Sequence, residues 1–247
     1  MLGTNPIRKQ ELDPAGTLWV QEIFPTIQGE GPNAGRSALF LRLGGCNLRC
    51  WFCDTDFESS TLRLSASALA ARIMREATTD SFRADLLVIT GGEPLRQNLV
   101  PLFELLQRED LPIQIETAGT IWVPGLEHFP RDVVELVCSP KTGKLHERIE
   151  RYCWDYKYIV RVSEPTDLVD GLPLCHTQAK WHTAGGVSQL MRPRLARPSN
   201  PAATIWVQPC DEKNEALNNA NRDYCAALVM KYGYRLSLQQ HKILNLP

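Results

Sequence analysis

Three thiols lie within eight residues in the stretch Cys46-Asn47-Leu48-Arg49-Cys50-Trp51-Phe52-Cys53. This C-x3-C-x2-C spacing suits a soft metal or an iron-sulfur cluster better than a disulfide. A structural zinc site takes four protein ligands, and the nearest histidine in sequence, His128, lies far from this cysteine loop (residues 46–53). A cubane cluster held by three thiolates leaves one iron open to another ligand. The alternatives are a zinc knuckle with a distant fourth ligand and a redox pair of Cys50 and Cys53.

Length and charge limit the class of protein. The 247 residues, 43% of them hydrophobic, suffice for the core of one α/β domain. The 27 basic and 28 acidic residues leave a net charge of -1, which gives no general affinity for nucleic acid or an anionic membrane. Residues 1–16 are charged and lack an apolar run, and the other five cysteines are scattered. We therefore expect a soluble, cytoplasmic protein with reduced thiols.

Apolar runs alternate with amphipathic segments along the chain. We expect strands at residues 18–24, 37–43, 85–90, 113–116, 133–138, 156–162 and 205–208. We expect helices at residues 65–77, around residues 99–106 and at residues 214–232, the last with an apolar face of Leu217, Ala220, Tyr224 and Leu228. Such alternation predicts parallel strands with right-handed crossovers. The strand-helix units are too few for a closed eight-stranded barrel, so the prediction is an open, partial (β/α) barrel.

The chain divides into a tail, residues 1–16, and a single domain, residues 17–247. One segment within the domain, residues 176–199, has no clear period. It contains four basic residues and no acidic one. We interpret it as a long insertion loop, which either is simply solvated or meets a partner through its positive charge.

The cysteine loop and the later stretch Gly91-Gly92-Glu93-Pro94 together resemble the radical S-adenosylmethionine (SAM) superfamily. In that superfamily the open iron of a [4Fe-4S] cluster binds SAM. Reductive cleavage of SAM then yields a 5'-deoxyadenosyl radical, which abstracts a hydrogen atom from the substrate. The resemblance implies that the cluster ligands are Cys46, Cys50 and Cys53.

Further stretches narrow the resemblance to the 7-carboxy-7-deazaguanine synthase family. They are residues 24–31, 50–55, 88–94, 114–117 and 234–247. The resemblance implies a lyase that converts 6-carboxy-5,6,7,8-tetrahydropterin to 7-carboxy-7-deazaguanine with loss of ammonia, on the route to queuosine. The radical would take hydrogen from C6 of the pterin, and SAM would be regenerated. Competing hypotheses are another radical SAM enzyme, such as a glycyl-radical activase, and a non-catalytic zinc or iron-sulfur protein.

The same resemblance implies the remaining site residues. The expected SAM contacts are Phe52, Cys53, Asp54, Gly92, Ser139, Pro140, Lys141, Gln208, Pro209, Cys210 and Asp211. The expected substrate contacts are Ile27, Gln28, Gly29, Glu30, Arg42, Thr90, His241 and Pro247, the last through its own carboxylate. Thr55 resembles the family's Mg2+ ligand. The expected partners are the pterin, a reductant such as a flavodoxin and a second copy of the chain, with no direct nucleic-acid or membrane contact.

Some of these residues also stand out by their chemistry. Arg42 lies inside an otherwise apolar strand, where a charge requires a partner, unless it faces outward. Its guanidinium can bind a carboxylate through two parallel hydrogen bonds. Gln28 and Glu30 have the donors and acceptors that match an aminopyrimidinone edge. Gly92, without a side chain, would let SAM approach the backbone closely.

Overall fold

The computed structural model describes residues 5–53, 55–175, 177–178 and 194–247. Its main sheet contains β1 (Leu18–Ile27), β2 (Ser37–Leu43), β3 (Arg63–Leu64), β6 (Leu86–Gly91), β7 (Ile113–Thr117), β8 (Val134–Cys138), β9 (Asp155–Val160), β10 (Thr204–Pro209) and β11 (Arg235–Leu236). A small separate hairpin consists of β4 (Thr78–Thr79) and β5 (Phe82–Arg83). The α-helices are α1 (Ala66–Ala77), α2 (Val100–Leu106), α3 (Glu147–Tyr152), α4 (Glu215–Tyr232) and α5 (Gln240–Ile243).

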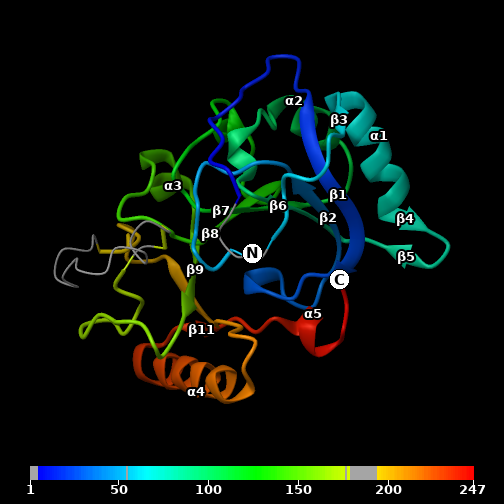
Figure 1. The fold of residues 1–247 in the computed structure, drawn as a ribbon. Helices are drawn as coiled ribbons and strands as arrows, with labels where there is room; N and C mark the ends of the chain where they lie inside the picture. Colours follow the sequence, from blue (N-terminus) through cyan, green and yellow to red (C-terminus); the bar gives the residue numbers. More distant parts are fainter. Residues whose placement is uncertain (1–4, 54, 176, 179–193) are drawn as a thin grey trace.

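The main sheet is curved and open. Its strand order is β11-β10-β9-β8-β7-β6-β2-β1-β3, and within the described residues its two edge strands, β3 and β11, do not pair with each other. All strands from β2 to β11 in this order run parallel. Figure 1 shows the strands of the sheet arranged in an arc, with helices α1 to α4 on its outer side. The predicted partial, open (β/α) barrel is confirmed.

Strand β1 differs from the predicted pattern in length and direction. It continues to Ile27 instead of ending at Phe24, and it runs antiparallel to β2. The glycine-rich segment between the two strands turns back on itself, since Gly35 N donates to Gln28 O at 2.7 Å. Glu22 consequently lies directly opposite Arg42 in the neighbouring strand. The start of the sheet is thus a hairpin rather than a strand-helix unit.

The core lies between the sheet and the outer helices. Leu39, Leu41 and Ile89 on the sheet are fully buried, as are Leu69 and Ile73 on α1. Ser65 caps α1, because its side chain accepts a hydrogen bond from Ala68 N at 3.3 Å. The observed range of this helix agrees with the predicted one to within a residue.

The buried face of α4 differs from the prediction. Leu217 is 40% exposed, whereas Asn221, Cys225 and Leu228 are buried. Asn221 can be buried because both ends of its amide are bonded: its Oδ1 accepts from Val162 N at 2.8 Å, and its Nδ2 donates to Cys210 O at 3.0 Å. An apolar periodicity cannot identify a buried polar residue, so the predicted buried face of α4 was displaced around the helix axis from the observed one.

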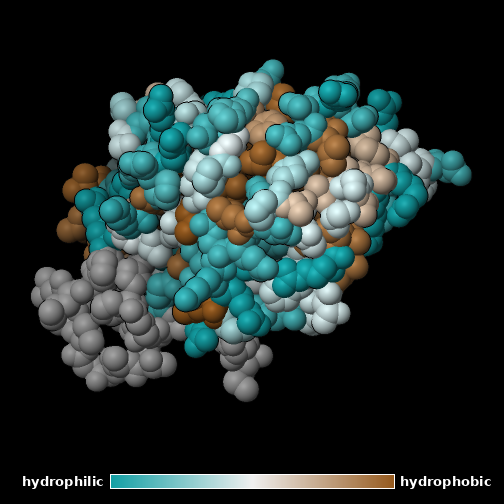
Figure 2. All heavy atoms as spheres, turned by 90° about the horizontal axis from the view of Figure 1, so that it is seen from above, coloured by the Kyte–Doolittle hydropathy of each residue, from teal (hydrophilic) through white to brown (hydrophobic). Residues whose placement is uncertain are grey.

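Figure 2 shows hydrophilic and hydrophobic residues interspersed over one face of the molecule. No helix in the described part of the chain is both long and apolar enough to cross a membrane.

Candidate active site

The cysteine loop follows β2 and forms one wall of a cavity at the carboxyl ends of the parallel strands. We call this the thiol cavity; its lining includes Cys46, Cys50, Phe52, Cys53, Thr55, Thr90, Gly92, Glu116, Ser139, Lys141 and Lys157. All three thiols are free, and Cys46 is the most buried, at 8% exposure. Burial, reinforced by the Glu93 carboxyl, raises the pKa of the Cys46 thiol to about 12. The Cys46 thiol would therefore lose its proton only on binding a metal, because a bound cation stabilises the thiolate.

The spacing of the thiols also fits a cluster. In the described residues, no group of three or more His, Cys, Asp or Glu converges on one point where a single metal ion could be held. A cubane takes each cysteine on a different iron, so its ligands stand around the cluster instead of meeting at a point. Three thiols that line one cavity satisfy that requirement, so the cysteine loop fits a [4Fe-4S] cluster.

Gly92 and Glu93 hold the cysteine loop against the end of β6. A Cβ atom on Gly92 would lie 2.2 Å from Gly45 O, and Glu93 N donates to the same oxygen at 3.0 Å. The carboxylate of Glu93 is fully buried and accepts from Thr117 Oγ1 at 2.7 Å and Ala118 N at 2.8 Å. Burial raises the pKa of Glu93, and these hydrogen bonds oppose the rise. The packing of the chain against itself therefore requires glycine at position 92. The expected close approach of SAM did not indicate this second requirement.

A second cavity adjoins the thiol cavity. We call it the polar cavity; its lining includes Thr26, Ile27, Gln28, Glu30, Arg42, Thr55, Thr90, Glu116, Gln239, His241 and Pro247. Three residues, Thr55, Thr90 and Glu116, line both cavities. The structure thus brings together the predicted substrate residues other than Gly29 beside the predicted cluster ligands; they come from β1, the segment after it, β2, β6 and the last residues of the chain.

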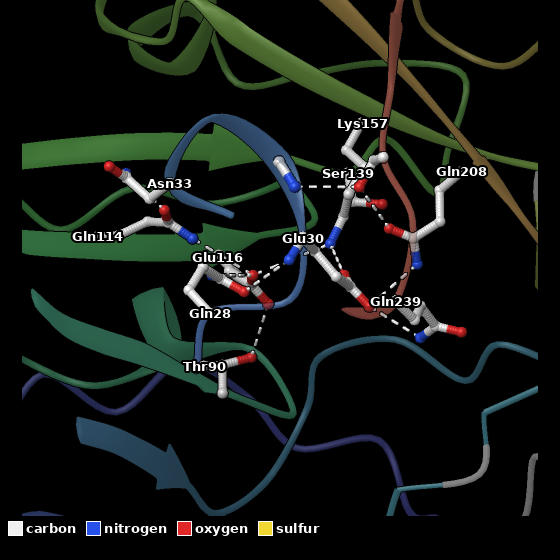
Figure 3. A network of polar contacts seen from close by, with 12 residues as sticks. Gln28, Glu30, Asn33, Thr90, Gln114, Glu116, Ser139, Lys157, Gln208 and Gln239 are labelled. Atoms are coloured by element: carbon white, nitrogen blue, oxygen red, sulfur yellow. Dashed lines mark hydrogen bonds and ion pairs between the residues drawn. The ribbon is translucent and has the colours of Figure 1, made fainter. Parts of the chain in front are cut away.

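Lys157 and Glu30 form an ion pair between the two cavities (Figure 3). The side chains are only 7% and 13% exposed. Gln208 Nε2 and Gln239 Nε2 donate to the other oxygen of Glu30 at 3.1 and 2.8 Å. Burial alone would raise the pKa of Glu30, but Lys157 and these donors outweigh it and hold the pKa well below its usual range. Glu30 is therefore an ionised carboxylate at neutral pH.

Glu116 is the second carboxylate near Lys157, with Oε1 at 3.9 Å from Nζ. Thr90 Oγ1 donates to the carboxylate of Glu116 at 3.3 Å, and Gln28 Nε2 donates to it at 3.2 Å. Figure 3 draws both hydrogen bonds. Burial lowers the pKa of Lys157, but Glu116 and Glu30 reverse that effect and raise the pKa above its usual value. Sequence reasoning missed the roles of Lys157, Glu116 and Gln239. For Lys157 and Glu116 the available signal was similar to the one noticed for Arg42, a charge inside a mostly apolar strand, whereas the uncharged Gln239 lies outside the strands and gave no such signal.

Arg42 reaches the polar cavity, yet it already has a carboxylate partner. Its Nε lies 2.6 Å from Glu22 Oε1, across the β1-β2 pair. Its guanidinium carbon lies 5.6 Å from the centre of the Phe24 ring. The Arg42 side chain is 21% exposed and that of Glu22 is 51% exposed. The ion pair of Arg42 and Glu22 is therefore solvent-accessible, and another carboxylate can compete with Glu22 for the guanidinium of Arg42.

The end of the chain closes the polar cavity. Gln240 N donates to Gly29 O at 3.2 Å, and a Cβ atom on Gly29 would lie 2.2 Å from His241 Nδ1. Only glycine permits this close approach. Thr26 Oγ1 donates to Pro247 O at 3.0 Å. Burial lowers the pKa of His241, although Glu30 opposes the change.

Comparisons with known proteins place the chain among its relatives. The model of the radical SAM superfamily matches residues 41–139. A 7-carboxy-7-deazaguanine synthase from Rhodospirillum rubrum is 39% identical over the whole of both chains. Another, from Rickettsia prowazekii, is 35% identical over all of this chain and 96% of the relative. The chain belongs to the 7-carboxy-7-deazaguanine synthase family. The solved structure of QueE from Escherichia coli shares the fold, with a TM-score of 0.60, 24% identity and coverage of 90% and 94%.

Not all of the SAM contacts expected for a member of the 7-carboxy-7-deazaguanine synthase family reach the thiol cavity. Phe52, Cys53, Gly92, Ser139 and Lys141 line it, and Lys141 Nζ donates to Ser139 O at 3.1 Å. Pro140 lies at a smaller cavity that shares Phe52 and Lys141 with the thiol cavity. Asp54 lies outside the described residues.

The segment after β10 lies elsewhere. Gln208 faces Glu30, whereas Pro209, Cys210 and Asp211 line a separate cavity beside Lys242 and Ile243. Hydrogen bonds from Lys242 and Lys213 lower the pKa of Asp211. The structure thus does not bring these three residues to the thiol cavity, because β10 ends beside α5 and not beside the cysteine loop. Their contact with SAM stays a prediction.

Proposed function

We propose that the protein converts 6-carboxy-5,6,7,8-tetrahydropterin to 7-carboxy-7-deazaguanine with loss of ammonia. Its relatives in R. rubrum and R. prowazekii carry the name of that synthase. The observation that carries the proposal is the shared wall of Thr55, Thr90 and Glu116 between the thiol cavity and the polar cavity. A substrate in the polar cavity would lie next to whatever the cysteine loop holds.

The cysteine loop would hold a [4Fe-4S] cluster through its three thiolates, with SAM beside it in the thiol cavity. When bound, the cluster and SAM supply the radical that removes a hydrogen atom from the substrate. Gly92, Ser139 and Lys141 line the cavity at positions where they would contact SAM. The radical chemistry requires a reductant, for which we propose a flavodoxin-like protein. We also propose that the protein works in the cytoplasm as a homodimer.

The polar cavity offers the groups that a carboxylated pterin requires. The ionised Glu30 accepts hydrogen bonds, and Gln28 offers both an acceptor and a donor, which match the N-H and C=O groups of an aminopyrimidinone. Arg42 is the cation for the substrate carboxylate, which would compete with Glu22 for its guanidinium. His241 and Pro247 lie at the same cavity and would complete the enclosure.

A magnesium ion would sit at the shared wall. The backbone of Thr55 is held by Asn5, whose Nδ2 donates to Thr55 O at 2.9 Å. Thr55 lines both cavities, and so does Glu116. Mg2+ prefers oxygen ligands and keeps several waters, so a hydroxyl and substrate oxygens suit it.

Anaerobic turnover tests the proposal. The reconstituted protein is incubated with SAM, a reductant, Mg2+ and the carboxytetrahydropterin, and the products are identified by mass spectrometry. We expect 7-carboxy-7-deazaguanine and ammonia. A matched reaction with tetrahydropterin lacking the carboxylate should give no ring contraction. A loaded protein that cleaves SAM but leaves the carboxypterin unchanged would refute the proposal and favour another radical SAM activity.

A further inference from the structure

Residues 177–178, which are far from the cysteine loop in sequence, lie across that loop. Trp51 N donates to Thr177 O at 3.1 Å, and Cys50 and Gln178 pair as an isolated antiparallel bridge. On its other side, Thr177 N donates to Lys141 O at 3.0 Å. Backbone hydrogen bonds therefore fix residues 177–178 between the cysteine loop and the loop after β8.

This segment aims two side-chain donors at one sulfur atom. Thr177 Oγ1 lies 3.0 Å from Cys50 Sγ, and Gln178 Nε2 lies 3.8 Å from it. The orientation of the Gln178 amide is set at its other end, because its Oε1 accepts from Arg49 N at 3.1 Å. The Thr177 hydroxyl has a second acceptor, Lys141 O at 3.3 Å, but an ionised thiolate is the stronger acceptor.

We propose that Thr177 and Gln178 are positioning residues that set the reduction potential of the iron-sulfur cluster through hydrogen bonds to the Cys50 thiolate. The inference rests on the cluster assignment of the proposed function. Reduction adds negative charge to the cluster, so donors aimed at a ligand sulfur stabilise the reduced form more than the oxidised form. Cys46 differs, because its sulfur accepts from a backbone group, Leu48 N at 3.4 Å, which side-chain substitutions leave in place.

The test compares reduction potentials in the full-length, anaerobically reconstituted protein. Thr177→Val removes the hydroxyl while keeping the side chain's shape, and Gln178→Met removes the amide donor. Iron content is measured first, and the potential is then read from a redox titration followed by electron paramagnetic resonance, without SAM or substrate.

We expect both variants to bind iron like the parent. Reduction of Thr177→Val should be about tenfold less favourable, a shift of about 59 mV for one electron. Gln178→Met should shift in the same direction by less, because its donor is farther from the sulfur. Thr177→Ser, which keeps the hydroxyl, should match the parent. The matched control is Thr142→Val, whose lost hydroxyl bonds Lys144 O and not a thiol, and its potential should not change.

The outcomes separate this inference from the proposed function. A parent protein that binds no [4Fe-4S] cluster would refute the cluster assignment itself. A loaded Thr177→Val with the parent's potential would overturn only the tuning role. If Thr177→Val alone loses iron, a lowered potential in Gln178→Met supports the role and an unchanged one overturns it. Loss of iron from both variants also overturns it, since the side chains would then shape the loop instead of the potential.

Discussion

Replacing Lys157 by methionine tests the charge arrangement between the two cavities. The substitution keeps a long, mostly apolar side chain but removes the cation that faces Glu30 and Glu116. Removing one partner of a buried ion pair costs roughly 3–5 kcal/mol, because the other charge stays buried. Here Gln208 and Gln239 still donate to Glu30, so we expect the lower end, about 3 kcal/mol at pH 7.

Urea unfolding of the anaerobic, cluster-loaded protein, followed by circular dichroism, measures this loss. The variant with both Lys157→Met and Glu30→Gln should recover part of it, since the buried charge is then gone. In a double-mutant cycle we expect a coupling free energy of at least about 1.5 kcal/mol. The argument would be refuted if Lys157→Met lost less than about 1 kcal/mol of unfolding free energy, or if the losses of the two single variants added up to that of the double variant.

The pH dependence of the stability loss in Lys157→Met tests the sign of the charges assigned to Glu30 and Lys157. In the parent, the pKa of Glu30 is lowered by folding, so its contribution to stability is present above the unfolded pKa, about 4.5, and is lost as the pH falls toward the folded value. In Lys157→Met, burial dominates and raises the pKa of Glu30, so acid relieves the buried charge. The difference in unfolding free energy between parent and variant should therefore shrink from pH 7 to pH 4. A difference that widens with acid would contradict the assigned charges.

The remaining predictions concern the cluster, the substrate and magnesium. Alanine at any one cysteine of the loop should abolish both iron binding and SAM cleavage, whereas Cys225→Ala should retain both and lose only about 1 kcal/mol of stability; retained iron in a loop variant would contradict the ligand set. Arg42→Ala should weaken binding of the carboxypterin by roughly 10- to 100-fold in a titration, with normal iron content; unchanged affinity would exclude the contact. Gly29→Ala should raise the Michaelis constant, because the new Cβ displaces His241; normal kinetics would show that the chain end can move without effect. Chelation of Mg2+ should slow turnover, and Thr55→Ala should do so even with Mg2+ present; equal rates throughout would remove the ion from the site.

Local patterns in the sequence predicted the elements whose residues act together along the chain. The cysteine loop and the Gly91-Gly92-Glu93-Pro94 stretch are of this kind, because each depends on spacing within a few residues. Parallel strands between helices followed from the alternation of apolar runs. These features sufficed to predict the partial barrel.

Features that depend on distant pairing could not be predicted. Glu22 meets Arg42 only because β1 turns back antiparallel in one particular register, and a shift of one residue would separate them. Lys157 pairs with Glu30, which lies 127 positions away in sequence. Asn221 is buried only because two loops form hydrogen bonds with its amide. Single-residue signals, such as a charge in an apolar strand, identified Arg42 but could not name its partner.

The central claim is that the thiol cavity and the polar cavity form one reaction site. Deuterium transfer measures this most directly: the loaded protein is given SAM, reductant and carboxytetrahydropterin labelled with deuterium at C6. The account predicts that 7-carboxy-7-deazaguanine forms and that deuterium appears in the adenosyl group of SAM. Product formed without any deuterium in SAM would contradict it.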